Sequence, residues 1–358
     1  MAVDEGEGMR IERMYLASAL LFILLTSFGG VFLIIETGRP SGSDINLHLK
    51  LADGWLKGDL PLFNKDYFNH GYPYPPAFHL SLALLSILFF TSPIAIVSVL
   101  QVVLYPLIYL STFYLVYRKT GPYIATMTVL LLATSPAFWD RATQAIPQAI
   151  DLAVFPLAAY FFLEKRDTRF EVSAAFMFYN HFMYAALLLL SLFLYSLFYE
   201  RSRLGVFVKA ALLFLPLILI MGAHFEAVMS ESRSINEEQE WAVLNEPLFA
   251  IKYLGYPLFF LLFLSLIHLA FKQVAAFDRL LLLWMASLMP MAVYFPDRFI
   301  EYVAQPLAIL GAVTLKDLIP QERPRAGILF MLFIFALAVQ YNLFATLIQN
   351  GEVFLPLD

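Results

Sequence analysis

The chain has 358 residues, of which 61% are hydrophobic and 14% are charged, and its net charge is −5 at pH 7. This composition excludes a soluble globular protein, shows no basic patch for nucleic acid, and predicts an all-α polytopic membrane protein without a soluble domain. The chain contains no cysteine, which excludes disulfides, thiolate metal sites and cysteine nucleophiles.

The N-terminal segment predicts a membrane anchor. Residues Met1 to Arg13 are polar, and no small-residue cleavage site follows the next apolar run, so Met14–Ile35 is predicted to be an uncleaved first transmembrane helix. Arg10 and Arg13 would hold its start on the cytoplasmic side of the membrane.

An amphipathic helix is predicted over Asp44–Lys57. Its polar stripe consists of Asn46, Lys50, Asp53 and Lys57, and its apolar face of Ile45, Leu49, Ala52 and Leu56. This pattern is typical of a helix that lies on a membrane surface. Asp44 and His48 are one turn apart and away from the polar stripe, so we expect both to face the protein or the bilayer interface. The alternative is that Asp44 caps the helix with Ser43 and that His48 packs as an amphipathic side chain.

A stiff segment follows this helix. From His70 to Pro76 the repeated prolines, with Tyr74 between two of them, favour an extended backbone, because each proline fixes its own φ and restricts the residue before it. The helix Ala77–Phe90, which carries His79, would be roughly 21 Å long, short of the roughly 30 Å of a bilayer core. We therefore expect it to be re-entrant or juxtamembrane, within an outer loop over residues 36–92.

This outer segment resembles a family of membrane enzymes. An acidic residue after the first transmembrane helix, the helix end A-x-G-W-L-x-G-x-L-P at 52–61 and the helix entry Y-P-Y-P-P-x-F-H at 72–79 are similar to the GT-C superfamily of glycosyltransferases. That superfamily includes the protein O-mannosyltransferases, the aminoarabinose transferases and the catalytic subunit of oligosaccharyltransferase. The pattern is similar to short prokaryotic members, including archaeal ones. The resemblance implies transfer of a sugar from a polyprenyl phosphate.

Ten further apolar segments follow, within residues 94–347. They are Ile94–Tyr117, Tyr123–Phe138, Ala145–Leu163, Val172–Asn180, Phe182–Tyr199, Leu204–Phe225, Pro247–Phe271, Leu280–Phe295, Phe299–Leu315 and Ala326–Leu347. With the first helix they predict about eleven transmembrane helices in a single transmembrane domain, 1–358. Val172–Tyr199 is either one crossing or a pair broken at Asn180-His181, and we expect the broken pair.

The distribution of positive charge predicts the orientation. If the N-terminus is cytoplasmic and Ala77–Phe90 does not cross, fifteen of the Lys and Arg residues lie inside and eight lie outside. The cell membrane is therefore the expected location, with the outer loops on the far side from the cytoplasm.

Several polar residues are predicted to meet at this outer side. Beside an outer turn that carries Asp140, the residues Arg141, Gln144, Gln148 and Asp151 recur at helical spacing and would form one stripe descending into a membrane helix. An acid at that depth normally faces a cavity or a partner, and the alternative here is a hydrogen-bonded seam between helices. His181 is expected on the same side. The acidic loop Glu226–Glu246 is either a lid or a solvated loop without a role.

A second polar stripe is predicted near the C-terminus. Arg298, Glu301 and Gln305 stand at i, i+3 and i+7, and Pro306 would let the outer half of the helix kink. The pattern R-F-x-x-Y-x-x-x-P-L-A-I-L at 298–310 resembles the late GT-C helix whose basic residue contacts the phosphate of the lipid donor. Arg298 would have that role. The alternative is that Arg298 extends to the interface and pairs locally with Glu301.

The resemblance and the chemistry together assign roles. Asp44 would be the general base and His48 would orient it, because a phosphate leaving group needs a base for the acceptor and a cation for the departing anion. Donor and phosphate contacts are assigned to Arg298, Arg141 and Tyr74, and the substrate cavity to His70, His79, Gln144, Gln148, Asp151, His181 and Glu301. Some relatives hold a divalent cation; Asp44 and Asp140 would then be its ligands and Mg or Mn the ion.

The expected partners are a polyprenyl-phosphate sugar donor, a lipid, glycan or protein acceptor, and membrane lipids. Two other functions stay open. A flippase or transporter of lipid-linked sugars would also need an outer vestibule and polar stripes, although no internal repeat of the kind common in transporters is visible. A non-catalytic subunit of a membrane assembly is the other alternative.

Overall fold

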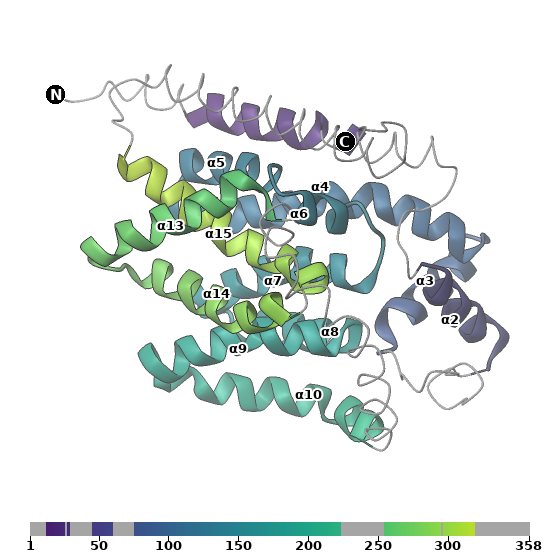
Figure 1. The fold of residues 1–358 in the computed structure, drawn as a ribbon. Helices are drawn as coiled ribbons and strands as arrows, with labels where there is room; N and C mark the ends of the chain where they lie inside the picture. Colours follow the sequence, from purple (N-terminus) through teal and green to yellow (C-terminus); the bar gives the residue numbers. More distant parts are fainter. Residues whose placement is uncertain are drawn as a thin grey trace, which may run out of the picture. The chain divides into compact units, whose positions relative to one another are not determined.

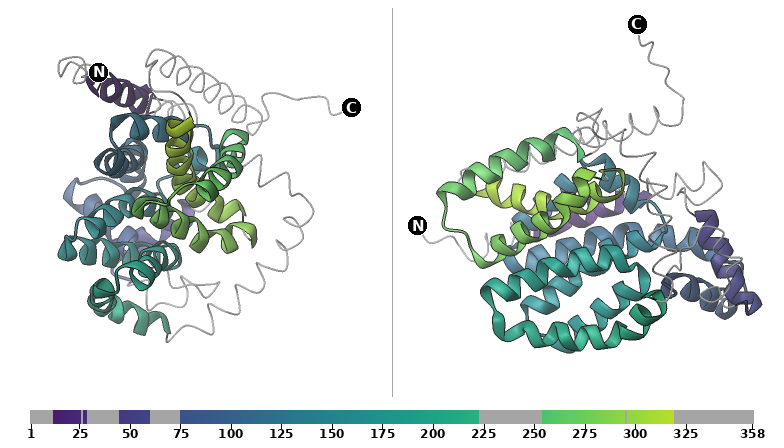
Figure 2. Two further views of the ribbon diagram at one scale, coloured as in Figure 1. Left: turned by 90° about the vertical axis from the view of Figure 1, so that its left-hand side faces the viewer. Right: turned by 60° about the horizontal axis from the view of Figure 1, so that its bottom comes forward.

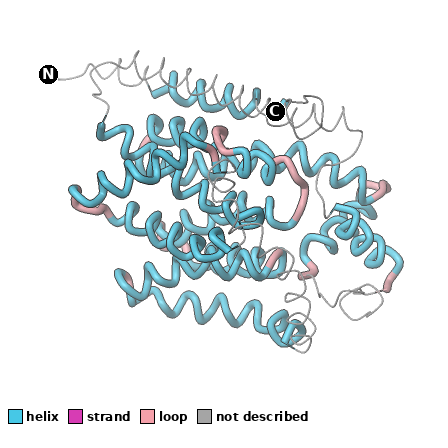
Figure 3. Tube along the Cα trace, viewed as in Figure 1, coloured by secondary structure: helices cyan, strands magenta, loops and turns pink. Residues whose placement is uncertain are grey.

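The computed structural model describes residues 12–25, 27–28, 45–59, 75–222, 254–294 and 296–318. These residues are helical apart from short connections, and none of them is in a strand (Figures 1 and 3). Besides the helical residues 12–25, the elements are α2 (Ile45–Lys57), α3 (Ala77–Leu88), α4 (Pro93–Thr120), α5 (Pro122–Leu132), α6 (Pro136–Ala142), α7 (Pro147–Leu163), α8 (Asp167–Asn180), α9 (Phe182–Tyr199), the 3-10 turn η2 (Arg201–Arg203), α10 (Leu204–Gly222), α13 (Tyr256–Phe271), α14 (Ala276–Tyr294) and α15 (Pro296–Leu318).

The chain has the helices of a multi-pass membrane protein. By length and composition, four described helices can cross a membrane: α4, α9, α14 and α15, and the bent pair α5–α6 would make a fifth. α3, α7 and α13 are apolar but shorter. The predicted count of about eleven spans is not confirmed, and the last of those spans, Ala326–Leu347, lies outside the described residues.

The described helices fall into two compact units. One contains residues 12–24, 112–141 and the described part of 254–318; the other contains 45–59, 75–111 and 142–222, together with residues 25 and 27–28. α4 belongs to both, with the division between Ser111 and Thr112. Each unit draws on separated stretches of the chain, so neither is a contiguous domain.

In the first unit, α15 is the central helix. It packs against α5, α13 and α14, which lie around it in Figure 1. Every residue from 299 to 314 is buried. Close helix packing is achieved at Gly311, where an added Cβ would lie 2.9 Å from Leu261 Cδ1 of α13. A small residue at this crossing lets the two helix backbones approach, as is common between membrane helices.

In the second unit, α7 to α10 pack as neighbouring helices, the teal segments of Figure 2. An aromatic cluster joins them: the ring of Phe162 lies 5.4 Å from that of Phe170 and 5.7 Å from that of Phe207. The buried Arg203 donates to the carbonyl of Phe162 and pairs with Asp167. α2 packs on α3, and α3 on α8.

The predicted break at the Asn180-His181 pair is present. α8 ends at Asn180 and α9 begins at Phe182, with His181 in an extended conformation, φ −154° and ψ 94°. α8 and α9 pack against one another and both pack against α7. The chain therefore folds back at His181, as expected for a broken pair.

Two predictions about the segment 122–163 have different outcomes. The predicted membrane segment Tyr123–Phe138 corresponds to α5 and the start of α6, which are bent by 89° and form either a broken span or a re-entrant loop. The polar stripe predicted from Arg141 to Asp151, in contrast, does not lie on one helix. Arg141 is in α6, Gln144 is in the following turn, and α7 begins only at Pro147. The reason is that a proline disfavours the α conformation in the residue before it, and Ile146 is extended, with φ −126° and ψ 164°.

The outward faces of several helices are apolar. α10 exposes Leu212 and Leu219, and α13 exposes Phe260, Phe263 and Ile267. In water such faces would be costly, whereas lipid chains solvate them without penalty. α15 continues through Pro306 as one helical element.

Candidate functional site

Two histidines of the predicted outer segment form a buried pair. α2 carries His48 on the face that packs against α3, opposite Lys50 and Lys57, and α3 carries His79 in its first turn. His48 Nδ1 and His79 Nε2 share a hydrogen bond of 2.9 Å, and both rings are almost completely inaccessible to solvent. The ring of Phe78 meets His48 edge to face, with centroids 5.4 Å apart. His48 therefore faces the protein, one of the two orientations expected for it.

The hydrogen bonds of this pair define its tautomers. His79 is also hydrogen bonded to the backbone of Pro75, which has no N–H, so the His79 ring is the donor there. With Nε2 engaged by His48, that donor is Nδ1 of His79, and Nε2 accepts from the Nδ1–H of His48. The lone pair of the His48 ring is therefore on Nε2.

Burial keeps both rings neutral. It lowers the pKa of His79 to about 4, an effect that the bond to Pro75 opposes. It also lowers the pKa of His48 well below the usual value, and the neighbouring rings of His79 and His181 act in the same direction. The described part of α2 and α3 thus presents imidazoles that can accept or relay a proton but carry no charge near neutral pH.

His181 is the third member of this group. It occupies the break between α8 and α9, is almost fully buried, and lies against Tyr184, with ring centroids 4.3 Å apart. α3 packs against α8, the helix that ends at this break, and His181 is close enough to His48 to act on it electrostatically. The structure therefore brings together His48, His79 and His181, which are separated by up to 133 positions in the chain (181 − 48).

Asp151 is held by the residue before this break. Asn180 Nδ2 donates to Asp151 Oδ1 at 2.8 Å and to the carbonyl of Pro147 at 2.6 Å. Both side chains are fully buried. The alternative prediction for Asp151, a hydrogen-bonded seam with a neighbouring helix, is the arrangement seen here. Gln148, one turn before Asp151 on α7, is also buried.

In the first unit, Arg141 pairs with Glu301. Arg141 Nε donates to Glu301 Oε1 at 2.8 Å, and the Glu301 side chain is 1% exposed. One turn later on α15, Gln305 Nε2 donates to Thr112 Oγ1 at 3.0 Å. Glu301 and Gln305 of this stripe therefore face protein. Glu301 thus pairs with Arg141, which is 160 positions away in the chain. Arg298 is nearer in sequence, one helical turn before Glu301.

Several predicted site residues lie outside the described part of the chain. Asp44, His70, Tyr74 and the loop Glu226–Glu246 lie outside the described residues, and the backbone of Arg298 is described in α15 without its side chain. Asp140 is half-buried in α6, close enough to Glu301 to act on it electrostatically. Among the described residues, no three His, Asp or Glu side chains are placed to hold a metal ion.

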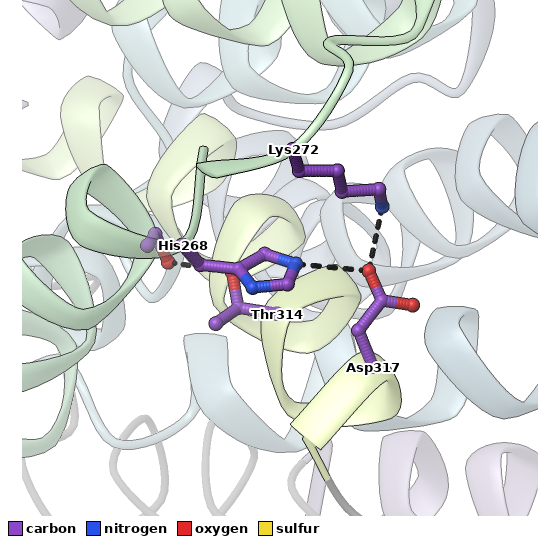
Figure 4. A network of polar contacts seen from close by, with 5 residues as sticks. His268, Lys272, Thr314 and Asp317 are labelled. Carbon is purple, nitrogen blue, oxygen red and sulfur yellow. Dashed lines mark hydrogen bonds and ion pairs between the residues drawn. The ribbon is translucent and has the colours of Figure 1, made fainter. Parts of the chain in front are cut away.

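One polar group was missed by sequence reasoning. Figure 4 shows His268 of α13 and Lys272, the residue that follows α13, both pointing toward Asp317 of α15. His268 Nε2 lies 3.0 Å and Lys272 Nζ 2.6 Å from Asp317 Oδ2, and the hydroxyl of Thr314 donates to Ser265 Oγ at 3.1 Å. The i, i+4 spacing of His268 and Lys272 was the available signal. The group ties the ends of two helices together, and all its charged members are partly exposed.

Comparison with known proteins gives no assignment. No family model matches the chain, and no curated protein matches it. Any function must therefore be argued from the residues and their geometry.

Proposed function

We propose that the chain is a membrane glycosyltransferase that moves a sugar from a polyprenyl phosphate to an acceptor hydroxyl at the outer face of the membrane. In this proposal Asp44 is the general base, His48 orients it or the substrate, and Arg298 binds the donor phosphate. The proposal rests on the residue pattern that resembles the GT-C superfamily and on the arrangement of α2 and α3.

The burial of His48 is the observation that supports this proposal best. A histidine on a helix that merely lies on a membrane would have its polar edge in the interface. His48 is instead enclosed and hydrogen bonded to His79. Ile45, the first residue of α2, is also buried, so the end of α2 that follows Asp44 is held against the protein. Fixed positioning of this kind is what a catalytic carboxylate requires.

The proposed reaction needs few groups. The acceptor oxygen attacks the anomeric carbon and forms a C–O bond, while the bond from that carbon to the phosphate oxygen breaks and its electron pair leaves with the phosphate. The acceptor proton passes to Asp44. Attack opposite to the leaving group inverts the anomeric configuration. A guanidinium at the phosphate would stabilise the charge that develops there, with a fork suited to two phosphate oxygens.

The role of Arg298 can be tested with radiolabelled polyprenyl-phosphate sugars and purified protein in nanodiscs. We expect Arg298→Ala to weaken use of the donor strongly, and Arg298→Lys to weaken it less, because lysine keeps the charge but loses the fork. A higher KM would indicate a contact made already in the ground state. A lower kcat would indicate a contact that strengthens as the phosphate departs. Equal donor affinity in the wild type and Arg298→Ala would remove Arg298 from this role.

A transporter of lipid-linked sugars is the second candidate. It is favoured by the helix break at His181 beside the buried Asp151, because transporters often place broken helices and buried acids at their binding sites. The two functions differ in product. A transferase forms a new glycosidic bond in detergent, whereas a transporter moves an unchanged lipid between leaflets of a vesicle. A non-catalytic subunit would do neither.

A further inference from the structure

The pair Asp151 and Asn180 contains two acceptors that lack donors. Asn180 uses its Nδ2 twice, toward Asp151 Oδ1 and toward the carbonyl of Pro147. This leaves Asp151 Oδ2 and Asn180 Oδ1, both fully buried, without a hydrogen-bond donor among the described residues. A buried acceptor without a donor costs on the order of 1–3 kcal/mol, and a buried bare carboxylate costs more.

Among the described residues, none supplies a cation to Asp151. α8 and α9 are the described helices that pack closely against α7. The titratable residues of α8, the break, α9 and the turn η2 are Asp167, Arg169, Glu171, Tyr179, His181, Tyr184, Tyr195, Tyr199, Arg201 and Arg203. The charged ones of α8 are in its first two turns, and Glu171 precedes Asn180 by nine residues, or about 14 Å of helix. Among the described groups, only Asn180 acts appreciably on Asp151.

Glu301 offers a contrast within the same chain. It is also buried in a membrane helix, but one of its oxygens accepts from Arg141 at 2.8 Å. That guanidinium compensates an ionised carboxylate. The donor to Asp151 is instead the side-chain amide of Asn180. A neutral amide cannot compensate a full charge in a buried site, whereas a guanidinium can.

We propose that Asp151 and Asn180 form a proton-binding site, in which Asp151 carries a proton on Oδ2 near neutral pH. The acid O–H is the donor that the amide carbonyl of Asn180 lacks, so one proton satisfies both orphaned oxygens. A proton is the ligand that this site fits best, because the site is closed to larger molecules and an alkali cation would need several more oxygen ligands. The inference does not depend on transferase activity.

Such a site has a physical consequence. A buried acid next to the break at His181 can hold a proton while α7, α8 and α9 stay packed, and would have to release it or meet water when they separate. Intramembrane acids with this property serve as proton relays in pumps and transporters. The packing of α7 on α8 would thereby be linked to the pH of the compartment to which it opens.

Infrared spectroscopy of the full chain tests the site directly. At pH 7 the wild type minus Asp151→Asn difference spectrum should show the C=O stretch of a protonated carboxylic acid, shifted in D2O. Asn180→Leu should keep this band but change its frequency, because the hydrogen-bond partner of the acid is lost. If the difference spectrum instead contains the bands of an ionised carboxylate, Asp151 is ionised in the wild type and the proposal is overturned.

Thermal unfolding supplies a second test. Asp151→Asn, which keeps the shape of a neutral acid, should leave Tm nearly unchanged at pH 7, whereas Glu301→Gln, the matched control, should lower it clearly. If Asp151→Asn fails to fold, a pH titration of the wild-type acid band still tests whether Asp151 is protonated, because the band should persist from pH 5 to 7.

A comparison of cations separates a proton site from an alkali-cation site. Tm of the wild type should be equal in Na⁺ and choline buffers. A rise of Tm with Na⁺ that Asp151→Asn abolishes would identify an alkali-cation site and overturn the proton assignment.

Discussion

Arg141 Nε donates to Glu301 Oε1 at 2.8 Å, joining the helix α6 to α15 across 160 positions of the chain. Both side chains are largely shielded from solvent. A pair of this kind is expensive to break, because removal of one partner leaves the other charge buried and uncompensated.

This pair leads to a prediction for single and double variants. Arg141→Met and Glu301→Gln should each destabilise the folded protein by about 3–5 kcal/mol, and the double variant should cost much less than the sum. Equilibrium unfolding of the four proteins in mild detergent measures the coupling. Additive effects would mean that the two side chains do not act as a pair.

The buried histidines predict an acid-labile fold. Burial lowers the pKa of His79 to about 4 and that of His48 well below its usual range. The unfolded chain, with histidine pKa values near 6.5, therefore binds more protons between about pH 6.5 and 4. Stability should be fully present above about pH 6.5 and fall as the pH is lowered, with His79 alone contributing on the order of 3 kcal/mol.

The measurement is Tm against pH for the wild type and for His48→Phe/His79→Phe. The double variant should show a flatter profile between pH 6.5 and 4, because no buried imidazole remains to be protonated on unfolding. His268→Gln, at the partly exposed histidine of α13, serves as the control and should keep the wild-type slope. A steep slope that survives the double substitution would place the acid sensitivity elsewhere.

Two glycines with the same backbone angle give a matched test of packing. Gly255 and Gly121 both have φ +98°, so alanine at either position is strained by about 1–2 kcal/mol. At Gly255, however, an added Cβ would also lie 2.5 Å from the carbonyl oxygen of Thr134, in the turn between α5 and α6. At Gly121 it would meet nothing within 4 Å. Gly255→Ala should therefore lower Tm more than Gly121→Ala, and equal losses would contradict the close approach.

Labelling of single cysteines tests the orientation, and the chain has no native cysteine to interfere. Lys57, Arg166 and Arg201 are exposed and flank the relevant helices. A membrane-impermeant maleimide added outside intact cells should label Lys57→Cys and neither Arg166→Cys nor Arg201→Cys. Labelling of only one of the last two would show that α8 and α9 form a single crossing rather than a hairpin.

The all-helical class and several individual helices of this protein could be predicted from sequence, and the connections between them less well. Periodicity predicted α2 and the buried face of His48, because an amphipathic pattern leaves little choice of orientation. It failed from Arg141 to Asp151, where continuous helical spacing was assumed through Pro147. Pro147 disfavours a helical conformation in Ile146, the residue before it, and this interrupts the helical spacing.

Partners distant in the chain could not be predicted at all. Nothing in the local sequence of Glu301 indicates Arg141 rather than Arg298, and nothing near Asp151 indicates Asn180, because these pairs depend on how helices pack. Residue types nevertheless indicated where to look. An Asp and a Glu in apolar helices are costly enough that each needs a partner or a proton.

The proposed activity is tested most directly by sugar transfer in the wild type and in Asp44→Asn. Purified proteins would be incubated with radiolabelled polyprenyl-phosphate sugars and membrane extract as the source of acceptor. We predict transfer by the wild type and its loss in Asp44→Asn, with Tm nearly unchanged, because an amide keeps the shape of the carboxylate but cannot accept the proton of the acceptor hydroxyl. Undiminished transfer by Asp44→Asn, or no transfer by the wild type from any donor sugar, would contradict the account.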